Sequence, residues 1–151
     1  MKFECTVPKV LRAVATKYPE VPAQISHEKD GSYRPTNYHD FYQTALDFGG
    51  ALMELGVKRG DHIGLIADNR AEWEHADMGL LAIGAIDVPR GCDATEKDLE
   101  LILSFAGCRM VITENSAQVK KLLNIRDRLP QVDTLIVFDE VDAEQRERTA
   151  I

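Results

Sequence analysis

The hydrophobic pattern is densest between residues 60 and 91, where it predicts a strand, a helix and a second strand. The first strand is the nearly all-apolar run 63–67, and residues 85–88 give the second. Between them, Asp68 and Asn69 are residue types that cap helices, and Gly84 is typical of a helix end. This order predicts a βαβ crossover in a parallel sheet. The predicted apolar face of the helix holds Trp73, Ala76, Leu80 and Ile83.

Two predicted elements precede this region. A helix is expected to start at Thr6, with Pro8 in its first turn and an apolar stripe along one side. The dipeptide Asp30-Gly31 lies between two short, polar runs, which predicts a small hairpin away from the main sheet. The stripe of the first helix consists of Val7, Val10, Leu11 and Val14.

A longer helix is predicted after the hairpin, ending at about residue 55. Asn37 is expected to cap it, with Asp40 reaching back as in a capping box. Gly49 and Gly50 interrupt the helix, and each costs about 1 kcal/mol relative to alanine. We therefore expect this part of the helix to pack closely against another element. The predicted buried face consists of Phe41, Ala45, Phe48, Leu52 and Leu55.

Two further strand-and-helix units are predicted after residue 91. Thr95 and Asp98 match a capping box, and Asn115 or Ser116 is expected to cap another helix between strands 109–113 and 134–138. Strands that alternate with helices predict an α/β fold with a doubly wound, mostly parallel sheet and helices on both faces, plus the small N-terminal hairpin. The predicted domain is 1–140, and 141–151 is expected to be a charged tail or linker.

Composition and charge narrow the class of protein. The net charge of −7 argues against a nucleic-acid partner and against a polybasic membrane anchor. The sequence contains no apolar run long enough to span a bilayer, and its N-terminus lacks the apolar core of a signal peptide. Cys5, Cys92 and Cys108 are unclustered, which argues against a disulfide framework or a zinc site. A cytoplasmic protein is the expectation.

Motifs that carry chemistry are largely absent. The sequence contains no phosphate-binding glycine loop, nucleophile elbow or zinc-protease motif. Cys92 and Arg90 lie in a loop after a predicted strand, where α/β folds place ligands, but a structural cysteine and a surface ion pair are the favoured interpretations. Glu72, His75 and Asp77 are expected to form the solvated face of the helix that Gly84 ends, with Trp73 in the core.

A phosphoacceptor receiver domain is a distant alternative. Asp87 and Thr113 lie near predicted strand ends, where such a domain has an acidic and a hydroxyl residue. The acidic pair after the first strand is missing, because Asp68 stands alone, and Phe138 is followed by acidic residues rather than lysine. These missing groups argue against a receiver.

The central segment resembles the N-terminal part of AMP-forming acyl-CoA synthetases, especially the long-chain fatty acid ligases. The similarity rests on the strand at 61–67, on Asn69-Arg70-Ala71-Glu72-Trp73, and on residues 84–91, which include Pro89, Arg90 and Gly91. It covers roughly residues 5 to 140 and is specific in order and spacing. It implies a partial subdomain of the adenylate-forming fold.

The resemblance implies a function for a complete enzyme rather than for this chain. Such an enzyme activates a fatty acid with ATP to an acyl-adenylate and transfers the acyl group to CoA, so ATP, Mg²⁺ and CoA are its implied cofactors. The family's signature motifs lie downstream of the matched region, so we assign no catalytic, cofactor-binding or metal residue here and expect the chain alone to be inactive. Its implied partners are the remainder of the adenylation domain and the small C-terminal domain.

Other interpretations of this chain stay open at this point. A free-standing binding or interaction module with the same fold is the alternative function. A homodimer also stays open, and peripheral membrane association is a property of long-chain synthetases that no residue pattern here indicates. Neither the acyl-chain length nor a role for Arg90 or Cys92 follows from the sequence.

Overall fold

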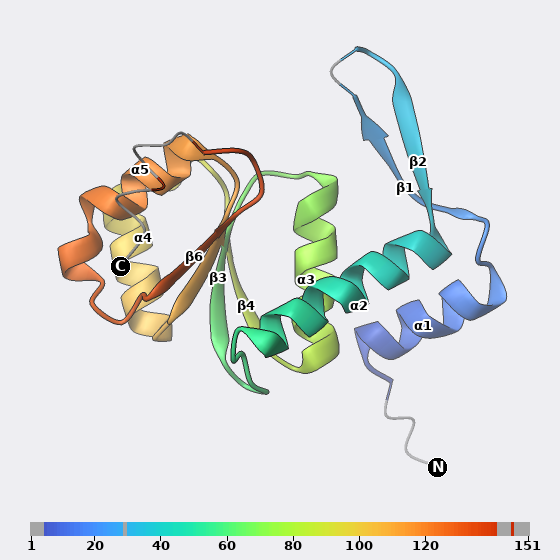
Figure 1. The fold of residues 1–151 in the computed structure, drawn as a ribbon, viewed down its shortest axis with the longest axis horizontal. Coiled ribbons are helices and arrows are strands. Elements are labelled where there is room, and N and C mark those ends of the chain that lie inside the picture. Colours follow the sequence, from blue (N-terminus) through green and yellow to red (C-terminus); the bar gives the residue numbers. More distant parts are fainter. Residues whose placement is uncertain (1–4, 29, 142–145, 147–151) are drawn as a thin grey trace. The chain divides into compact units, whose positions relative to one another are not determined.

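Four parallel strands form the main sheet in the order β4-β3-β5-β6 (Figure 1). The computed structural model describes residues 5–28, 30–141 and 146. Its strands are β3 (His62–Ile66), β4 (Ile86–Arg90), β5 (Met110–Thr113) and β6 (Thr134–Val137). The parallel register sets Leu65 beside Pro89 on one side and beside Ile112 on the other. The structure thus confirms a parallel α/β sheet.

The described residues divide into two units. One consists of the residues up to Arg59 together with Asn69–Ala85, and the other of Gly60–Asp68 and the residues from Ile86 onward. The first unit contains the helices α1 (Val7–Lys17), α2 (Tyr38–Glu54) and α3 (Ala71–Ile83) and the strands β1 (Pro22–His27) and β2 (Tyr33–Asn37). The second contains the sheet, α4 (Glu96–Ala106), α5 (Ser116–Asn124) and the short 3₁₀ helix Arg126–Arg128.

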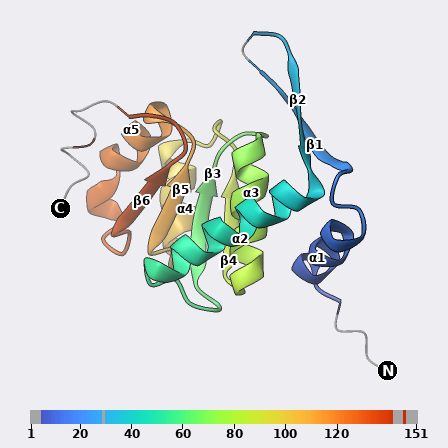
Figure 2. The same cartoon turned by 45° about the vertical axis from the view of Figure 1, so that its right-hand side comes forward.

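The predicted hairpin is present in the first unit. β1 and β2 pair antiparallel, with Ile25 beside Pro35 and His27 beside Tyr33 (Figure 2). Ile25 and Tyr33 are largely exposed, and the ring of His27 meets that of Tyr33 edge-on at 5.2 Å between centroids. The hairpin is therefore a two-stranded element outside the main sheet, as the sequence predicts.

The core of the second unit lies under α4 and α5. Ile66 and Val111 from the sheet pack with Leu99 and Leu103 from α4 and with Leu122 from α5. Leu99 and Leu103 therefore form the buried side of α4. The remaining buried members of this cluster are Ala94, Cys108, Ile125 and Leu129.

Several helix ends agree with the sequence prediction. Thr95 and Asp98 form the complete capping box of α4, and the side chain of Asn115 accepts hydrogen bonds from the first turn of α5. Gly84 and Gly107 end their helices with positive φ. These local signals work because the bonds join residues two or three positions apart.

Other predicted details are wrong. α3 begins at Ala71 with Arg70 in the N-cap position and no side-chain cap, because the Asp68 carboxylate accepts a bond from the Cys92 N–H instead. The Asn37 side chain caps α2, whereas the Asp40 carboxylate lies 3.1 Å from His39 Nδ1 rather than reaching back. β4 continues through Pro89, which an edge strand tolerates because one side needs no N–H donor.

Four expectations about helix faces also need correction. Leu55 is largely exposed, because it stands at the end of α2, beyond the buried stripe. His75 is half-buried, with its ring 5.0 Å from that of Phe41, so it is not on a solvated face. Val7 and Val10 on α1 are about half exposed. Trp73 itself is only partly buried.

Candidate functional site at the carboxyl ends of the strands

Three polar side chains meet where successive strands of the sheet end. Asp68 comes after β3, Cys92 after β4 and Glu114 after β5. Because the strands are parallel, their carboxyl ends share one edge, which is where α/β sheets place ligands. The carboxylate oxygens and the thiol sulfur of these residues lie within 4.8 Å of one another. This strand-end cluster is the candidate site of the described residues.

Hydrogen bonds within the strand-end cluster hold the loops together. Asp68 Oδ1 accepts from the backbone N–H of Cys92 at 2.8 Å, and Glu114 Oε2 accepts from the backbone N–H of Asp68 at 2.9 Å. The Cys92 thiol lies 3.5 Å from the same Glu114 oxygen and donates to it. The two carboxylates thus tie the ends of three strands to one another.

The electrostatic surroundings make Cys92 a poor nucleophile. Burial, followed by the negative charge of Glu114 and then that of Asp68, raises the pKa of the Cys92 thiol to about 11. The reactive and metal-binding form of cysteine is the thiolate. At neutral pH the thiol therefore stays protonated, which agrees with its role as a hydrogen-bond donor.

Lys121 supplies a cation next to this cluster, but it is bound to the chain. Its Nζ donates to the carbonyl oxygens of Cys92 at 2.7 Å and of Ala94 at 2.9 Å. These bonds fix the loop after β4 against α5. The ammonium group therefore orders the loop between β4 and α4.

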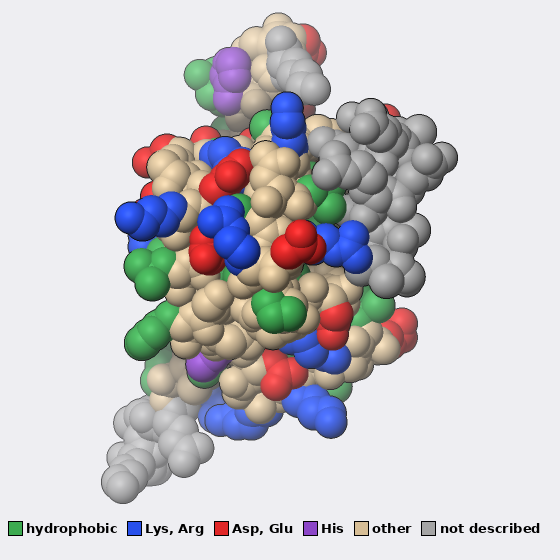
Figure 3. Space-filling model, turned by 90° about the vertical axis from the view of Figure 1, so that its left-hand side faces the viewer, with side chains coloured by type: hydrophobic (Ala, Val, Ile, Leu, Met, Phe, Trp, Pro, Cys, Tyr) green, Lys and Arg blue, Asp and Glu red, His purple; other side chains and the backbone are tan. Residues whose placement is uncertain are grey.

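The cluster does not fit the groups that an AMP-forming ligase handles. Mg²⁺ takes oxygen ligands in a near-octahedral set, and nucleotide phosphates need cations and free N–H donors. Here Asp68 Oδ1 and Glu114 Oε2 already accept backbone N–H bonds, and the protonated Cys92 thiol donates to the same Glu114 oxygen. On the face of the second unit seen in Figure 3, cations and anions are interspersed, and no broad basic patch is visible there. We derive no catalytic step from these residues.

Two other residues singled out in the sequence, Arg90 and Thr113, interact with groups of the chain itself. The Arg90 side chain is exposed, and its charge helps to keep the pKa of Asp98 low, after the larger effect of the bonds from Thr95. Thr113 is fully buried and its hydroxyl donates to the Ile66 carbonyl oxygen at 3.3 Å. A buried hydroxyl in that role does not support the receiver alternative.

Sequence reasoning missed two members of the arrangement, Glu114 and Lys121. The signal for Glu114 was present, because it comes directly after a buried strand, as Asp68 does, and parallel strands end at one edge. The role of Lys121 depends on how α5 lies against a loop that ends 27 residues earlier in the chain. No pattern of neighbouring residues predicts a contact between groups this far apart in the chain.

A comparison with models of known protein families shows which family the chain belongs to. The family model described as AMP-binding enzyme matches residues 11–150. The chain belongs to the AMP-binding enzyme family. This match confirms the resemblance, which the sequence analysis gives over roughly residues 5 to 140.

Curated relatives in this family are much longer than the chain. It is 33% identical over 109 residues to the long-chain-fatty-acid–[acyl-carrier-protein] ligase AEE15 of Arabidopsis thaliana, covering 72% of this chain and 15% of that protein. It is 23% identical over 141 residues to the long-chain-fatty-acid–CoA ligase ACSBG2 of Xenopus laevis, covering 93% of this chain and 19% of the relative. The chain thus spans less than a fifth of the length of either relative.

Solved structures show the same fold. The anthranilate CoA ligase AuaEII matches 91% of the chain with a TM-score of 0.81, at 23% identity and over 26% of its own length. The N-terminal domain of FACL13 from Mycobacterium tuberculosis matches 94% of the chain with a TM-score of 0.78, at 23% identity and over 34% of its own length. The described residues therefore have the fold of part of an adenylate-forming enzyme.

Proposed function

We propose that this chain is the N-terminal scaffold of an AMP-forming long-chain fatty acid–CoA ligase. The complete enzyme activates a fatty acid with ATP to an acyl-adenylate and transfers the acyl group to CoA. The observation that carries the proposal is the family match over residues 11–150, together with long-chain ligases among the relatives. One of these relatives is an acyl-carrier-protein ligase, so the thiol of a carrier protein is a second candidate acceptor of the acyl group.

In this proposal the chain contributes structure, and the reacting groups come from the rest of the enzyme. The support is the strand-end cluster, whose carboxylates and thiol are engaged with one another and with backbone N–H groups. ATP, Mg²⁺ and CoA would bind mainly to segments beyond those matched here. The chain's partners would be the remainder of the adenylation domain and the small C-terminal domain.

The domain boundaries and the cellular location belong to the same proposal. Residues 1–140 form the α/β part, and 141–151 form a charged tail or linker, most of which lies outside the described residues. Among the helices of the described part of the chain, none has the length and apolar character needed to cross a bilayer. We place the complete enzyme in the cytoplasm, and a homodimer is compatible with the proposal.

The test is to express the coding sequence continued past Ile151 and to compare it with the 151-residue chain. With CoA present as the acyl acceptor, we expect palmitate-dependent release of AMP from ATP by the longer protein and none by the chain alone. AMP release by the chain alone would contradict the scaffold role. A longer protein that forms no acyl-adenylate with any fatty acid would favour the alternative, a free-standing binding module.

A further inference from the structure

A hydrogen bond between two side chains joins the hairpin to α3. Gln24 Nε2, on β1, lies 3.5 Å from His75 Nε2, on α3, and both residues are partly buried. Because an amide nitrogen only donates, His75 Nε2 is the acceptor, so the ring is neutral and carries its proton on Nδ1. Both residues belong to the first unit.

The amide group of Gln24 relies on this bond. Its Oε1 atom is buried and accepts no hydrogen bond from the described residues. Turning the amide over would place an NH₂ group, with two donors, at that buried position, which costs more than one unused acceptor. The bond to His75 is therefore the interaction that compensates the burial of this amide.

A bulge at the base of the hairpin positions Gln24. Pro22 and Gln24 pair with successive residues of β2, so Ala23 is an extra residue between them. Such bulges change the direction of the neighbouring side chain. The contact with α3 therefore depends on a backbone feature that is specific to this end of β1.

The charges that act on His75 within the described structure oppose one another. Glu72 and Glu74, in the first turn of α3, favour the protonated ring, whereas Arg34 on β2 disfavours it. Burial has the largest influence and lowers the pKa of His75 below its usual value of 6.5. The group that meets the ring from α2 is the uncharged Phe41, and α1, which also packs against α3, adds no charge to this set.

We propose that Gln24 and His75 form a proton-controlled latch between the hairpin and α3. While the ring is neutral, the amide donates to Nε2 and the latch is closed. When Nε2 takes up a proton from water, it changes from acceptor to donor, and the bond is lost. A partly buried amide and a partly buried positive charge then remain without that bond, which is unfavourable. Movement of the hairpin away from α3 lets water solvate both groups, so mild acid favours the open arrangement.

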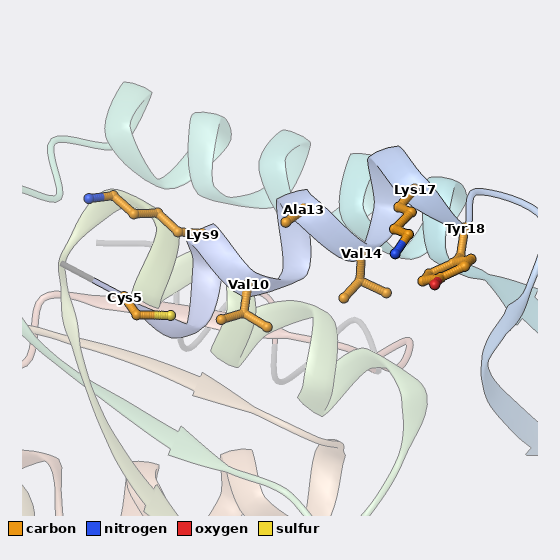
Figure 4. A pocket seen from close by; sticks show the side chains of 7 residues that line it. All are labelled: Cys5, Lys9, Val10, Ala13, Val14, Lys17 and Tyr18. Atoms are coloured by element: carbon orange, nitrogen blue, oxygen red, sulfur yellow. The ribbon is translucent and has the colours of Figure 1, made fainter. Parts of the chain in front are cut away.

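Backbone bonds to α2 give this movement a pivot. The Pro19 carbonyl oxygen accepts from the His39 N–H at 3.1 Å, and the Val21 carbonyl oxygen accepts from the Tyr38 N–H at 3.0 Å. The connector that holds these carbonyls starts at Tyr18, which Figure 4 shows at the end of α1. Backbone bonds do not titrate, so they stay in place when the latch opens. The latch does not depend on ligase activity, and its failure would leave the family assignment intact.

Amide hydrogen exchange of the 151-residue chain tests the latch. After correction for the intrinsic effect of pH on exchange, the protection of the β1 and β2 amides should fall about fivefold between neutral pH and about pH 5, as expected for one lost hydrogen bond. The protection of the β3 amides should change less, which separates opening of the latch from unfolding. His75→Gln supplies an acceptor that does not titrate, so it should make the protection of the hairpin independent of pH.

A second variant tests the donor. Gln24→Met keeps the length of the side chain but removes the N–H, so it should raise the pKa of His75, because the neutral ring loses its hydrogen bond. Gln43→Met is the matched control, since the Gln43 amide is exposed and donates to Asp47 within α2. It should leave the titration of His75, followed by NMR, unchanged.

NMR of the ring nitrogens also identifies the tautomer, and we expect the neutral ring to be protonated on Nδ1. Four results would overturn the proposal. The first is a neutral ring protonated on Nε2, because that nitrogen would donate at every pH. The second is hairpin protection that stays constant in mild acid, and the third is a loss of protection that the β3 amides share equally. The fourth is a His75 pKa that is the same in the wild type and in Gln24→Met.

Discussion

The backbones of Gly49 and Gly79 touch where α2 crosses α3. A Cβ on Gly49 would lie 2.9 Å from the carbonyl oxygen of Gly79, and a Cβ on Gly79 would lie 3.1 Å from the amide nitrogen of Gly49. Ala45 and Leu52 flank this crossing on α2, and both are buried. The close approach of the two helices is thus possible only because neither position has a side chain.

Gly49→Ala should therefore destabilise the chain. The added methyl group would force the helices apart, a kind of overpacking that costs about 1–3 kcal/mol and outweighs the gain of about 1 kcal/mol in helix propensity. Gly50→Ala is the matched control, since a Cβ there meets nothing within 4 Å and should be neutral or stabilising. Urea denaturation of both variants measures the difference, and equal midpoints would contradict the packing argument.

The capping box of α4 predicts a pH-dependent contribution to stability. Thr95→Ala should cost about 1 kcal/mol at neutral pH, whereas Thr95→Ser keeps the hydroxyl and should cost little. Bonds from Thr95 lower the pKa of Asp98 below its ordinary value of 3.8. The stabilisation from the bonds between Thr95 and the Asp98 carboxylate is therefore complete above pH 3.8. It is lost as the pH falls through the lower pKa that Asp98 has in the folded chain. Denaturation curves at neutral and acidic pH check this, and a Thr95→Ala cost that stays constant in acid would contradict it.

The environment of Cys92 predicts slow reaction with thiol reagents. In a Cys5→Ser background, Ellman's reagent should modify Cys92 only slowly near pH 8, because the burial of the thiol and the negative charges of Glu114 and Asp68 raise its pKa to about 11. Glu114→Gln removes one of these charges and should increase the rate severalfold. Glu140→Gln changes an exposed carboxylate elsewhere and should leave the rate unchanged. Identical rates in all three proteins would show that Glu114 does not act on the thiol.

The partial burial of His75 predicts that the chain is less stable in mild acid. Burial is the main cause that lowers the pKa of His75 below 6.5, and the ring also packs against Phe41. The unfolded chain therefore binds more protons near pH 6, so stability should rise with pH through this range and fall below it. His75→Gln should reduce this slope in urea titrations relative to the wild type. An unchanged slope in His75→Gln would contradict the role of His75.

Local patterns predicted the elements of this fold well. Thr95 with Asp98, and Asn115 with the first turn of α5, form caps within three residues, and the apolar run at 63–67 is buried as its composition predicts. What failed depends on distant partners. Asp68 is a residue type that caps helices, but its carboxylate accepts a hydrogen bond from the backbone N–H of Cys92, 24 residues away.

The faces of the outer helices were harder to predict. Periodicity marks an apolar stripe, but it does not say how much of that stripe a neighbour covers, and on α1 the neighbours cover Leu11 and Ala15 while Val7 and Val10 stay open. For the candidate site, the sequence supplied the strand ends and Cys92. The bond that Glu114 accepts from the Asp68 N–H depends on the sheet order, and the bond that Lys121 donates to the Cys92 carbonyl oxygen depends on how α5 lies against the loop.

Thermal melting with ligands tests the central claim that this chain is a scaffold without a complete site. The measurement compares the 151-residue chain alone with the chain in MgATP, AMP or palmitoyl-CoA. A ligand that binds only the folded state, at 100 times its dissociation constant, would add about 2.7 kcal/mol of stability. We predict a cooperative transition whose midpoint none of the three ligands moves. A clear upward shift with any of them would contradict the scaffold account and would show that a ligand site is intact in this chain.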